Sequence, residues 1–256
     1  MVEIPSLDAH AHFDPRRTSA ELAEAGAVLA MTLSLEEADR VVHRQEPLIA
    51  WGVGCHPRKL AAQQAFNPDH FAELAAQAAV IGEIGLDVGS KVPLDLQLRT
   101  FRSALAYAAH NPRIVSIHSF GTASSSRTSS TSLVLAELKR QSIAAPILHW
   151  WTGTAAETRQ AVELGCYFSV HSAVARRSVF RTQVPPERLL VESDHGWADP
   201  PGAIPHRVIW VEYLLSASLG IDVHQVRQLV WKNFAEVVRL TDTGELLPVA
   251  LAKMFG

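Results

Sequence analysis

The chain has 256 residues, of which 48% are hydrophobic, and its formal net charge is −3. This length and apolar content suffice for a large core, such as that of an α/β barrel, and the charge excludes a global basic field that would attract nucleic acid. Any polyanion would therefore have to bind to a local positive patch. No charged segment followed by an apolar one opens the chain and no apolar run reaches about 18 residues, so neither secretion nor a membrane span is expected.

The two cysteines, Cys55 and Cys166, each lie in an apolar run of strand length. This setting is typical of buried free thiols. Together with the missing secretion signal, it indicates a reducing compartment, and we expect the protein in the cytoplasm. A disulfide between the two cysteines is the alternative.

Strand-like runs alternate with helix signals through the first half of the chain. Patterns of a capping box at Thr18–Glu21 and Ser34–Glu37 predict that helices begin there. We expect strands at Leu7–Ala9, Ala27–Leu33, Leu48–Val53 and Val80–Asp87, and helices at Ala20–Ala25, from Ser34 to about His43, and from Asn67 to about Ala79.

The alternation continues through the second half. A helix with one apolar face is predicted by the spacing of Leu94, Leu98, Phe101 and Leu105. The polar, low-complexity stretch Gly121–Ser132 cannot bury a core, so we interpret it as a mobile loop. We expect strands at Ile114–His118, Ile147–His149, Cys166–Val170 and Leu189–Asp194, and helices at Leu133–Gln141, from a capping box at Thr154 to Gly165, around Val208–Leu215, around Val223–Val230, and from Asn233 to near Leu240.

Eight strand candidates that alternate with helices predict a (β/α)8 TIM barrel, formed as a single domain over residues 1–256. The strands are continuously apolar, as expected for a parallel sheet that is covered on both faces. A doubly wound open sheet is the alternative. No G-x-G-x-x-G segment follows a strand, which disfavours the nucleotide-binding version of that fold.

Potential metal ligands fall at the predicted strand ends. His10 and His12 are two residues apart, so in a strand both imidazoles point to one side, and neutral imidazole binds zinc, iron, manganese or copper. The carboxyl ends of barrel strands share one rim, where the active site lies. We therefore expect a metal site formed by His10, His12, Glu83, His118, His149 and Asp194. A buried carboxylate is costly unless it is paired or bound to a metal, which favours this interpretation over isolated core residues.

Several motifs make the chain resemble the TatD family of metal-dependent hydrolases, within the amidohydrolase-like TIM barrels. They occur in the order typical of the family and cover almost the whole chain: Asp8–Phe13, Gly54–Pro57, Gly82–Asp87, Ile117–His118, His149–Gly153 and Glu192–Asp194. Asn233 and Phe234 also resemble the family's last helix. The motif around Glu83 is the most specific of these.

The resemblance implies a site for two divalent ions, whether zinc, manganese or magnesium. It assigns His10, His12 and Asp194 to one ion and His118 and His149 to the other, with Glu83 bridging them. Two such cations stabilise the attacking and leaving oxygens of a phosphodiester. Asp194 would orient or deprotonate the attacking water, so Glu83 and Asp194 are the expected catalytic residues.

His56 and Asp87 follow predicted strands within the family-like motifs, but neither is needed to complete the two metal sites. We expect them to hydrogen-bond to the ligands and to orient them, a role whose loss typically costs about 10- to 100-fold. For His56 the alternative is a turn residue before Pro57.

DNA is the substrate that the resemblance implies, either single-stranded or at ends. Arg176 and Arg177, followed by Arg181, would supply a local positive patch. Trp150, Trp151 and Trp197 lie next to ligand positions and would stack on bases. The alternatives are a solvated helix face for the arginines and wall packing for the tryptophans.

Two departures from the family pattern leave the substrate open. Ser119 and Phe120 stand where an arginine commonly follows the fifth-strand histidine, and His195-Gly196-Trp197 stand where a proline usually follows the aspartate. The alternatives to a nuclease are a hydrolase of a small ester, lactone or amide, and a partner-binding protein that retains a metal. Family members also work beside other proteins in bacterial defence or DNA-processing operons, so protein partners are a further expectation.

Overall fold

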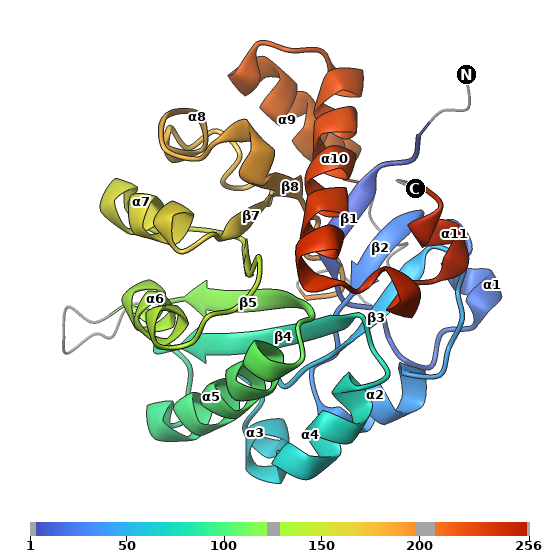
Figure 1. Cartoon of the computed structure of the whole chain (residues 1–256), viewed down its shortest axis with the longest axis vertical. Helices are drawn as coiled ribbons and strands as arrows, with labels where there is room; N and C mark the ends of the chain where they lie inside the picture. Colours follow the sequence, from blue (N-terminus) through green and yellow to red (C-terminus); the bar gives the residue numbers. More distant parts are fainter. Residues whose placement is uncertain (1–3, 122–128, 198–207, 255–256) are drawn as a thin grey trace.

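The computed structural model describes residues 4–121, 129–197 and 208–254. Its eight strands pair in parallel in the order β1 to β8, and helices surround them (Figure 1). The predicted (β/α)8 barrel is therefore confirmed. The strands are β1 (Leu7–Ala11), β2 (Ala27–Ala30), β3 (Ile49–Val53), β4 (Val80–Asp87), β5 (Ile114–Phe120), β6 (Ile147–His149), β7 (Tyr167–Val170) and β8 (Leu189–Val191).

The helices follow the strands along the chain and pack outside them. They are α1 (Ser19–Leu22), α2 (Leu35–Val41), α3 (Leu60–Ala65), α4 (Pro68–Ala75), α5 (Leu94–His110), α6 (Ser130–Arg140), α7 (Ala155–Glu163), α8 (Val179–Thr182), α9 (Ile209–Leu219), α10 (Val223–Thr241) and α11 (Val249–Ala252), with short 3-10 turns at Pro186–Arg188 and Gly244–Leu246. Within the described ranges, no helix combines the length and apolar character needed to cross a membrane.

The barrel closes where the first strand meets the segment just after the last. The Asp194 amide donates to the His10 carbonyl over 3.0 Å, and the His12 amide donates to the His195 carbonyl over 2.6 Å. The entry to β1 is also held by the last long helix, since the indole of Trp231 on α10 donates to the Pro5 carbonyl over 2.7 Å. Residues from both ends of the chain therefore meet at one side of the barrel.

Side-chain caps set where several helices begin. The capping boxes predicted at the starts of α1 and α7 are both present. At α2, the Ser34 hydroxyl accepts from the Glu37 amide, but the Glu37 carboxylate accepts from the Leu33 amide over 2.7 Å instead of from Ser34. The predicted box at Ser34 is therefore only half formed.

The end of the chain differs from the prediction in one respect. The two helices expected around Val223–Val230 and from Asn233 form one continuous helix, α10. The buried Asn233 side chain does not mark a new helix start; it donates to the carbonyls of Pro186 and Leu189, each over 2.8 Å. This side chain ties α10 to the beginning of β8.

Some predicted boundaries also shift. The eighth strand ends at Val191 rather than Asp194, so Asp194 lies in the turn beyond it. Helix α6 begins at Ser130, where the Ser129 hydroxyl accepts from the Ser132 amide, so the last residues of the predicted loop Gly121–Ser132 are helical. Residues 122–128 of that loop lie outside the described residues.

The core fills the barrel and the space between its strands and helices. All residues of the first four strands are buried, because these strands are covered on both faces. The largest fully buried side chains include Trp151, Tyr167, Phe71, Phe101, Phe168 and Phe234. Cys55 and Cys166 are buried and free, as predicted from their apolar surroundings.

Candidate metal centre

The structure brings the six predicted ligands together at the rim of the barrel. Each is at most 7% exposed. His10 lies on β1 and His12 directly after it, Glu83 lies within β4, His118 on β5, His149 at the end of β6, and Asp194 in the turn after β8. The β4–β5 register shifts between Ile81 and Ile84, so Glu83 sits at an irregularity of its strand.

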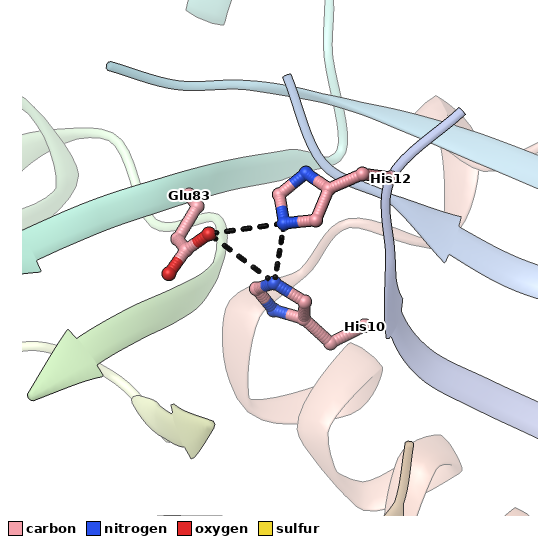
Figure 2. Close-up of side chains that lie close together, drawn as sticks. All are labelled: His10, His12 and Glu83. Carbon is pink, nitrogen blue, oxygen red and sulfur yellow. Dashed lines mark hydrogen bonds and ion pairs between the residues drawn. The ribbon is translucent and has the colours of Figure 1, made fainter. Parts of the chain in front are cut away.

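One half of the centre is built from β1 and β4, as Figure 2 shows. The Nε2 atoms of His10 and His12 are 3.3 Å apart, and Glu83 Oε2 lies 3.4 Å from the first and 3.1 Å from the second. Asp194 Oδ1 approaches the same two nitrogens at 3.7 and 3.5 Å. Two ring nitrogens and two carboxylate oxygens therefore face a common point.

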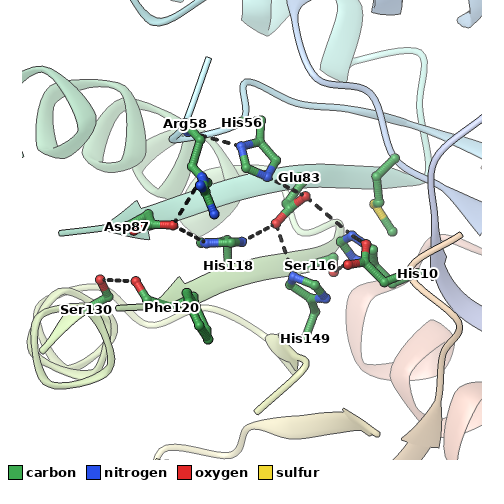
Figure 3. A network of polar contacts seen from close by, with 12 residues as sticks. His10, His56, Arg58, Glu83, Asp87, Ser116, His118, Phe120, Ser130 and His149 are labelled. Atoms are coloured by element: carbon green, nitrogen blue, oxygen red, sulfur yellow. Dashed lines mark hydrogen bonds and ion pairs between the residues drawn. The ribbon is translucent and has the colours of Figure 1, made fainter. Parts of the chain in front are cut away.

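The other oxygen of Glu83 faces a second pair of histidines (Figure 3). Glu83 Oε1 lies 2.6 Å from His118 Nδ1 and 3.1 Å from His149 Nε2. The His149 ring stacks on that of His10 with centroids 3.9 Å apart, which holds the two halves against each other. A carboxylate whose two oxygens face different histidine pairs has the geometry that a bridging ligand requires.

Contacts of their Nδ1 atoms orient the rings of His10 and His12. The His12 Nδ1–H donates to the Met31 carbonyl over 3.2 Å, and His10 Nδ1 lies 2.8 Å from the Ser116 hydroxyl. Because a carbonyl can only accept, His12 in its neutral form carries its proton on Nδ1 and leaves Nε2 bare. The bare nitrogen is the one that faces Glu83 and Asp194.

The carboxylate of Glu192, for which no role was predicted, orients the His149 ring. Glu192 is fully buried, and its Oε1 lies 3.1 Å from His149 Nδ1, while its Oε2 accepts a short hydrogen bond from the Ser169 hydroxyl. Burial raises the pKa of Glu192, and His149 opposes this shift. The signal in the sequence was an acidic residue placed directly after the apolar run Leu189–Val191.

Predicted supporting residues His56 and Asp87 both contact the centre. His56 Nε2 lies 3.3 Å from Glu83 Oε2, and His56 Nδ1 accepts from the Arg58 amide over 3.0 Å. Because an amide can only donate, neutral His56 carries its proton on Nε2, the nitrogen that faces Glu83. Burial holds the pKa of His56 well below its usual value, so this neutral form persists at pH 7. Asp87 Oδ2 lies 3.3 Å from His118 Nε2.

The electrostatics of the centre favour a bound cation. Burial raises the pKa of both Glu83 and Asp194, but the surrounding histidines outweigh burial and hold both pKa values below their usual range. Glu83 Oε2 and Asp194 Oδ1 are buried without a well-aligned hydrogen-bond donor among the described residues. Ionised, buried oxygens beside imidazole nitrogens are the donor set that zinc and manganese prefer. The residues present therefore fit divalent metal ions.

The pKa values of His10 and His12 shift in opposite directions in these surroundings. Burial lowers the pKa of His10 to about 4. Burial also lowers the pKa of His12, but the adjacent carboxylates of Asp194 and Glu83 outweigh burial and raise this pKa to about 9. His12 thus offers positive charge to the two carboxylates, as does His149, whose pKa burial lowers but Glu192 and Glu83 raise well above its usual value.

The centre forms the floor of a cavity of about 250 Å³. Its lining residues are His56, Arg58, Glu83, His118, Ser119, Phe120, His149, Trp150, Asp194 and Trp197. Phe120 is 52% exposed, the ring of Trp150 stacks on His171 at 3.8 Å, and that of Trp197 stacks on His56 at 4.3 Å. Aromatic rings therefore form much of the wall above the centre.

The predicted substrate contacts fall into two groups. Trp150 and Trp197 line the cavity, whereas the fully buried Trp151 and the arginines Arg176 and Arg177 do not. Arg176 is exposed, and the guanidinium of Arg177 donates to the carbonyls of Trp151 and Gly153 over 3.1 and 2.8 Å. Arg177 thus holds the turn after β6, and a contact of Arg176 with substrate stays a prediction.

The turn after β8 places Asp194 by means of two left-handed residues. Asp194 has φ 49° and Gly196 has φ 87°. A Cβ at Gly196 would lie 2.1 Å from the His12 carbonyl oxygen, so only glycine allows the turn to approach β1 this closely. This approach brings Asp194 next to His12.

A parallel (β/α)8 barrel with a histidine and carboxylate centre at its rim is the fold and site of a metal-dependent hydrolase. A family model described as TatD related DNase matches residues 7–239. The chain belongs to this family, as its motifs predicted.

Solved structures agree with this assignment. The chain resembles YjjV, a TatD homologue from Escherichia coli K12, with a TM-score of 0.74 and 20% identity over 92% of this chain and 98% of that one. It also resembles a hydrolase of the TatD family from Entamoeba histolytica, with a TM-score of 0.67 and 14% identity over 91% of this chain and 98% of that one. A dihydroorotase from Campylobacter jejuni shares the fold with a TM-score of 0.55 and 10% identity, over 93% and 83% of the two chains. No curated protein matches the chain.

Proposed function

We propose that this protein is a metal-dependent deoxyribonuclease that hydrolyses phosphodiester bonds in single strands or at DNA ends. The observation that carries the proposal is the placement of two buried, ionised carboxylates, Glu83 and Asp194, among histidines at the floor of an aromatic-lined cavity. His10, His12 and Asp194 would hold one divalent ion, and His118 and His149 a second, with Glu83 shared between them. When bound, such ions act as Lewis acids on the phosphoryl oxygens.

The surrounding residues have separate roles in this proposal. Asp194 is ionised at neutral pH and faces the cavity, so it orients the attacking water and accepts its proton. His56 and Asp87 hold Glu83 and His118 in place through the contacts described above. Trp150 and Trp197 offer their rings to bases.

The shape of the cavity supports single strands or ends as substrate. A cavity of about 250 Å³ with aromatic walls suits one unstacked nucleotide, which favours a single strand or an end over an intact duplex. A frayed end or a single strand presents one unstacked nucleotide at a time.

A small neutral ester, lactone or amide is the second candidate substrate. The aromatic wall of the cavity favours it, as does the net charge of −3, which does not attract a polyanion over distance. Ions held at the same residues would polarise a carbonyl oxygen as well as a phosphoryl oxygen.

The decisive experiment compares substrates on metal-loaded protein. We expect hydrolysis of single-stranded or recessed DNA with added zinc, manganese or magnesium, and little activity on p-nitrophenyl acetate or a simple lactone. Hydrolysis of the small substrates alone would replace the nuclease by the second candidate. Elemental analysis of a His10→Ala, His12→Ala double variant should find about one ion fewer per chain than the wild type, and unchanged metal content would refute the ligand assignment.

We further propose the cytoplasm as the site of action, where both thiols stay reduced. The resemblance to the family also suggests partner proteins from a bacterial defence or DNA-processing operon. Co-purification of the tagged chain with products of its neighbouring genes tests this suggestion, and recovery of the chain alone would count against it.

A further inference from the structure

Arg58, to which the sequence assigned no role, lies next to His56 and Asp87, as Figure 3 shows. Arg58 follows the turn after β3, and its side chain lines the cavity while it remains 45% exposed. Its Nε lies 3.7 Å from Asp87 Oδ2, and its guanidinium carbon lies 5.7 Å from the centroid of the Trp197 ring. These neighbours confine the side chain, yet no hydrogen bond from the guanidinium is present within the described parts of the chain.

The charge of Arg58 is only partly balanced by its acidic neighbour. Asp87 is 2% exposed, and its two oxygens already serve other groups. Its Oδ2 lies 3.3 Å from His118 Nε2, and its Oδ1 accepts from the Gly89 amide over 3.0 Å. Asp87 therefore orients the guanidinium but leaves most of its five donors available.

Arg58 is also distinct from the rest of the cavity wall. Among the described residues that line the cavity, it is the only lysine or arginine. The neighbouring Lys59 is exposed and lies over the same Trp197 ring at 5.2 Å, but it does not line this cavity. One cation among aromatic walls is the pattern expected for a ligand that combines a flat ring with an anionic group.

We propose that Arg58 makes the protein specific for a substrate with an anionic group. Its guanidinium binds a phosphate group of the nucleotide whose base packs against the aromatic wall. The planar fork of arginine matches two phosphate oxygens at once, which a lysine cannot do. This proposal rests on the proposed nuclease function and adds to it the recognition of a phosphate at the cavity wall, separate from the six metal-site residues.

The test compares a charged ligand with an uncharged one. Isothermal titration calorimetry measures the binding of thymidine 5′-monophosphate and of thymidine to metal-loaded wild type, Arg58→Ala, Arg58→Lys and Lys59→Ala. We expect Arg58→Ala to weaken binding of the monophosphate by about 10- to 100-fold, the usual effect of losing hydrogen bonds to a charged group, and to change thymidine binding less than about twofold. Arg58→Lys should restore part of the loss.

Lys59→Ala is the matched control, because it removes the same charge from the other residue over Trp197. It should bind both ligands as the wild type does. The proposal is overturned if Arg58→Ala binds the monophosphate as tightly as wild type, if thymidine binding falls equally, if Lys59→Ala shows the same loss, or if the wild type does not bind the monophosphate.

Binding and hydrolysis are measured separately, so the two proposals fail in different ways. A wild type that binds the monophosphate through Arg58 but cleaves no DNA would refute the nuclease and keep the anion site. A wild type that cleaves DNA with unchanged kcat/KM in Arg58→Ala would keep the nuclease and refute the role of Arg58.

Discussion

Replacing Asp194 with asparagine removes one negative charge from the centre at nearly constant shape. The residue adopts the left-handed φ of 49°, which asparagine tolerates as well as aspartate does. Its backbone amide keeps the hydrogen bond to the His10 carbonyl that closes the barrel. We therefore expect Asp194→Asn to fold and to melt within a few degrees of the wild type.

The loss of activity should nevertheless be large. Asp194 Oδ1 lies 3.5 Å from His12 Nε2 and has no well-aligned donor among the described residues, so its charge is directed at the centre and not at a backbone turn. An amide cannot accept a proton from water. Loss of a general base typically costs about 10² to 10⁴ in rate, or roughly 3 to 5 kcal/mol in activation free energy. Weaker metal binding would add to this loss.

The assay is kcat on a DNA oligonucleotide at saturating metal, with metal content measured by elemental analysis. Asp242→Asn is the matched control, because Asp242 also has a left-handed φ, 51°, but ends α10. The control should retain full activity, since it makes the same acid-to-amide change outside the centre. A kcat of Asp194→Asn within about threefold of wild type would leave Asp194 as an ordinary turn residue and refute its role as a base.

Three other predictions test the neighbourhood of the centre. Glu192→Gln removes the charge that orients His149, so metal affinity in a chelator competition should fall about 10- to 100-fold, and an unchanged affinity would contradict that role. Gly196→Ala forces a Cβ to within 2.1 Å of the His12 carbonyl, so the unfolding free energy should fall by at least about 1 to 2 kcal/mol, and a wild-type melting curve would show that the turn relaxes freely. Burial raises the pKa of the Cys55 and Cys166 thiols to about 12, so the reactive thiolate is scarce at pH 8. Iodoacetamide at this pH should therefore label both cysteines only after denaturation. Rapid labelling of the native protein would show that the thiols are accessible at the surface.

The barrel could be predicted from the sequence because its strands are continuous apolar runs that alternate with capped helices. The same regularity located the centre, since ionisable residues at strand ends must meet at one rim. The helices α3, α8 and α11 escaped prediction because their four to six residues are too few to show a helical apolar pattern and their starts also lack a side-chain cap; Lys59 at the start of α3, for example, makes no capping hydrogen bond.

Beyond His56 and Asp87, which the family-like motifs indicated, the supporting contacts could not be predicted because they join distant segments. Asp8 is buried and accepts from the Ser193 amide over 3.0 Å, although 185 positions separate the two residues. Glu192 reaches His149 across 43 positions. The two arginines Arg58 and Arg177 also have different environments in the fold: Arg58 lines the cavity, whereas Arg177 donates to backbone carbonyls. Residue type and local pattern carry no information on such partners.

The order of the ligands along the chain has a consequence for biosynthesis. His10 and His12 leave the ribosome first, but the partners of their strand edge, Asp194 and His195, are almost the last strand-end residues to be made. At a translation rate of roughly 5 to 20 residues per second, one edge of the first strand stays unpaired for about 10 to 40 s. The proposed ion position that includes Asp194 would therefore assemble only after most of the chain has been translated, and we expect that added metal does not stabilise truncated nascent chains.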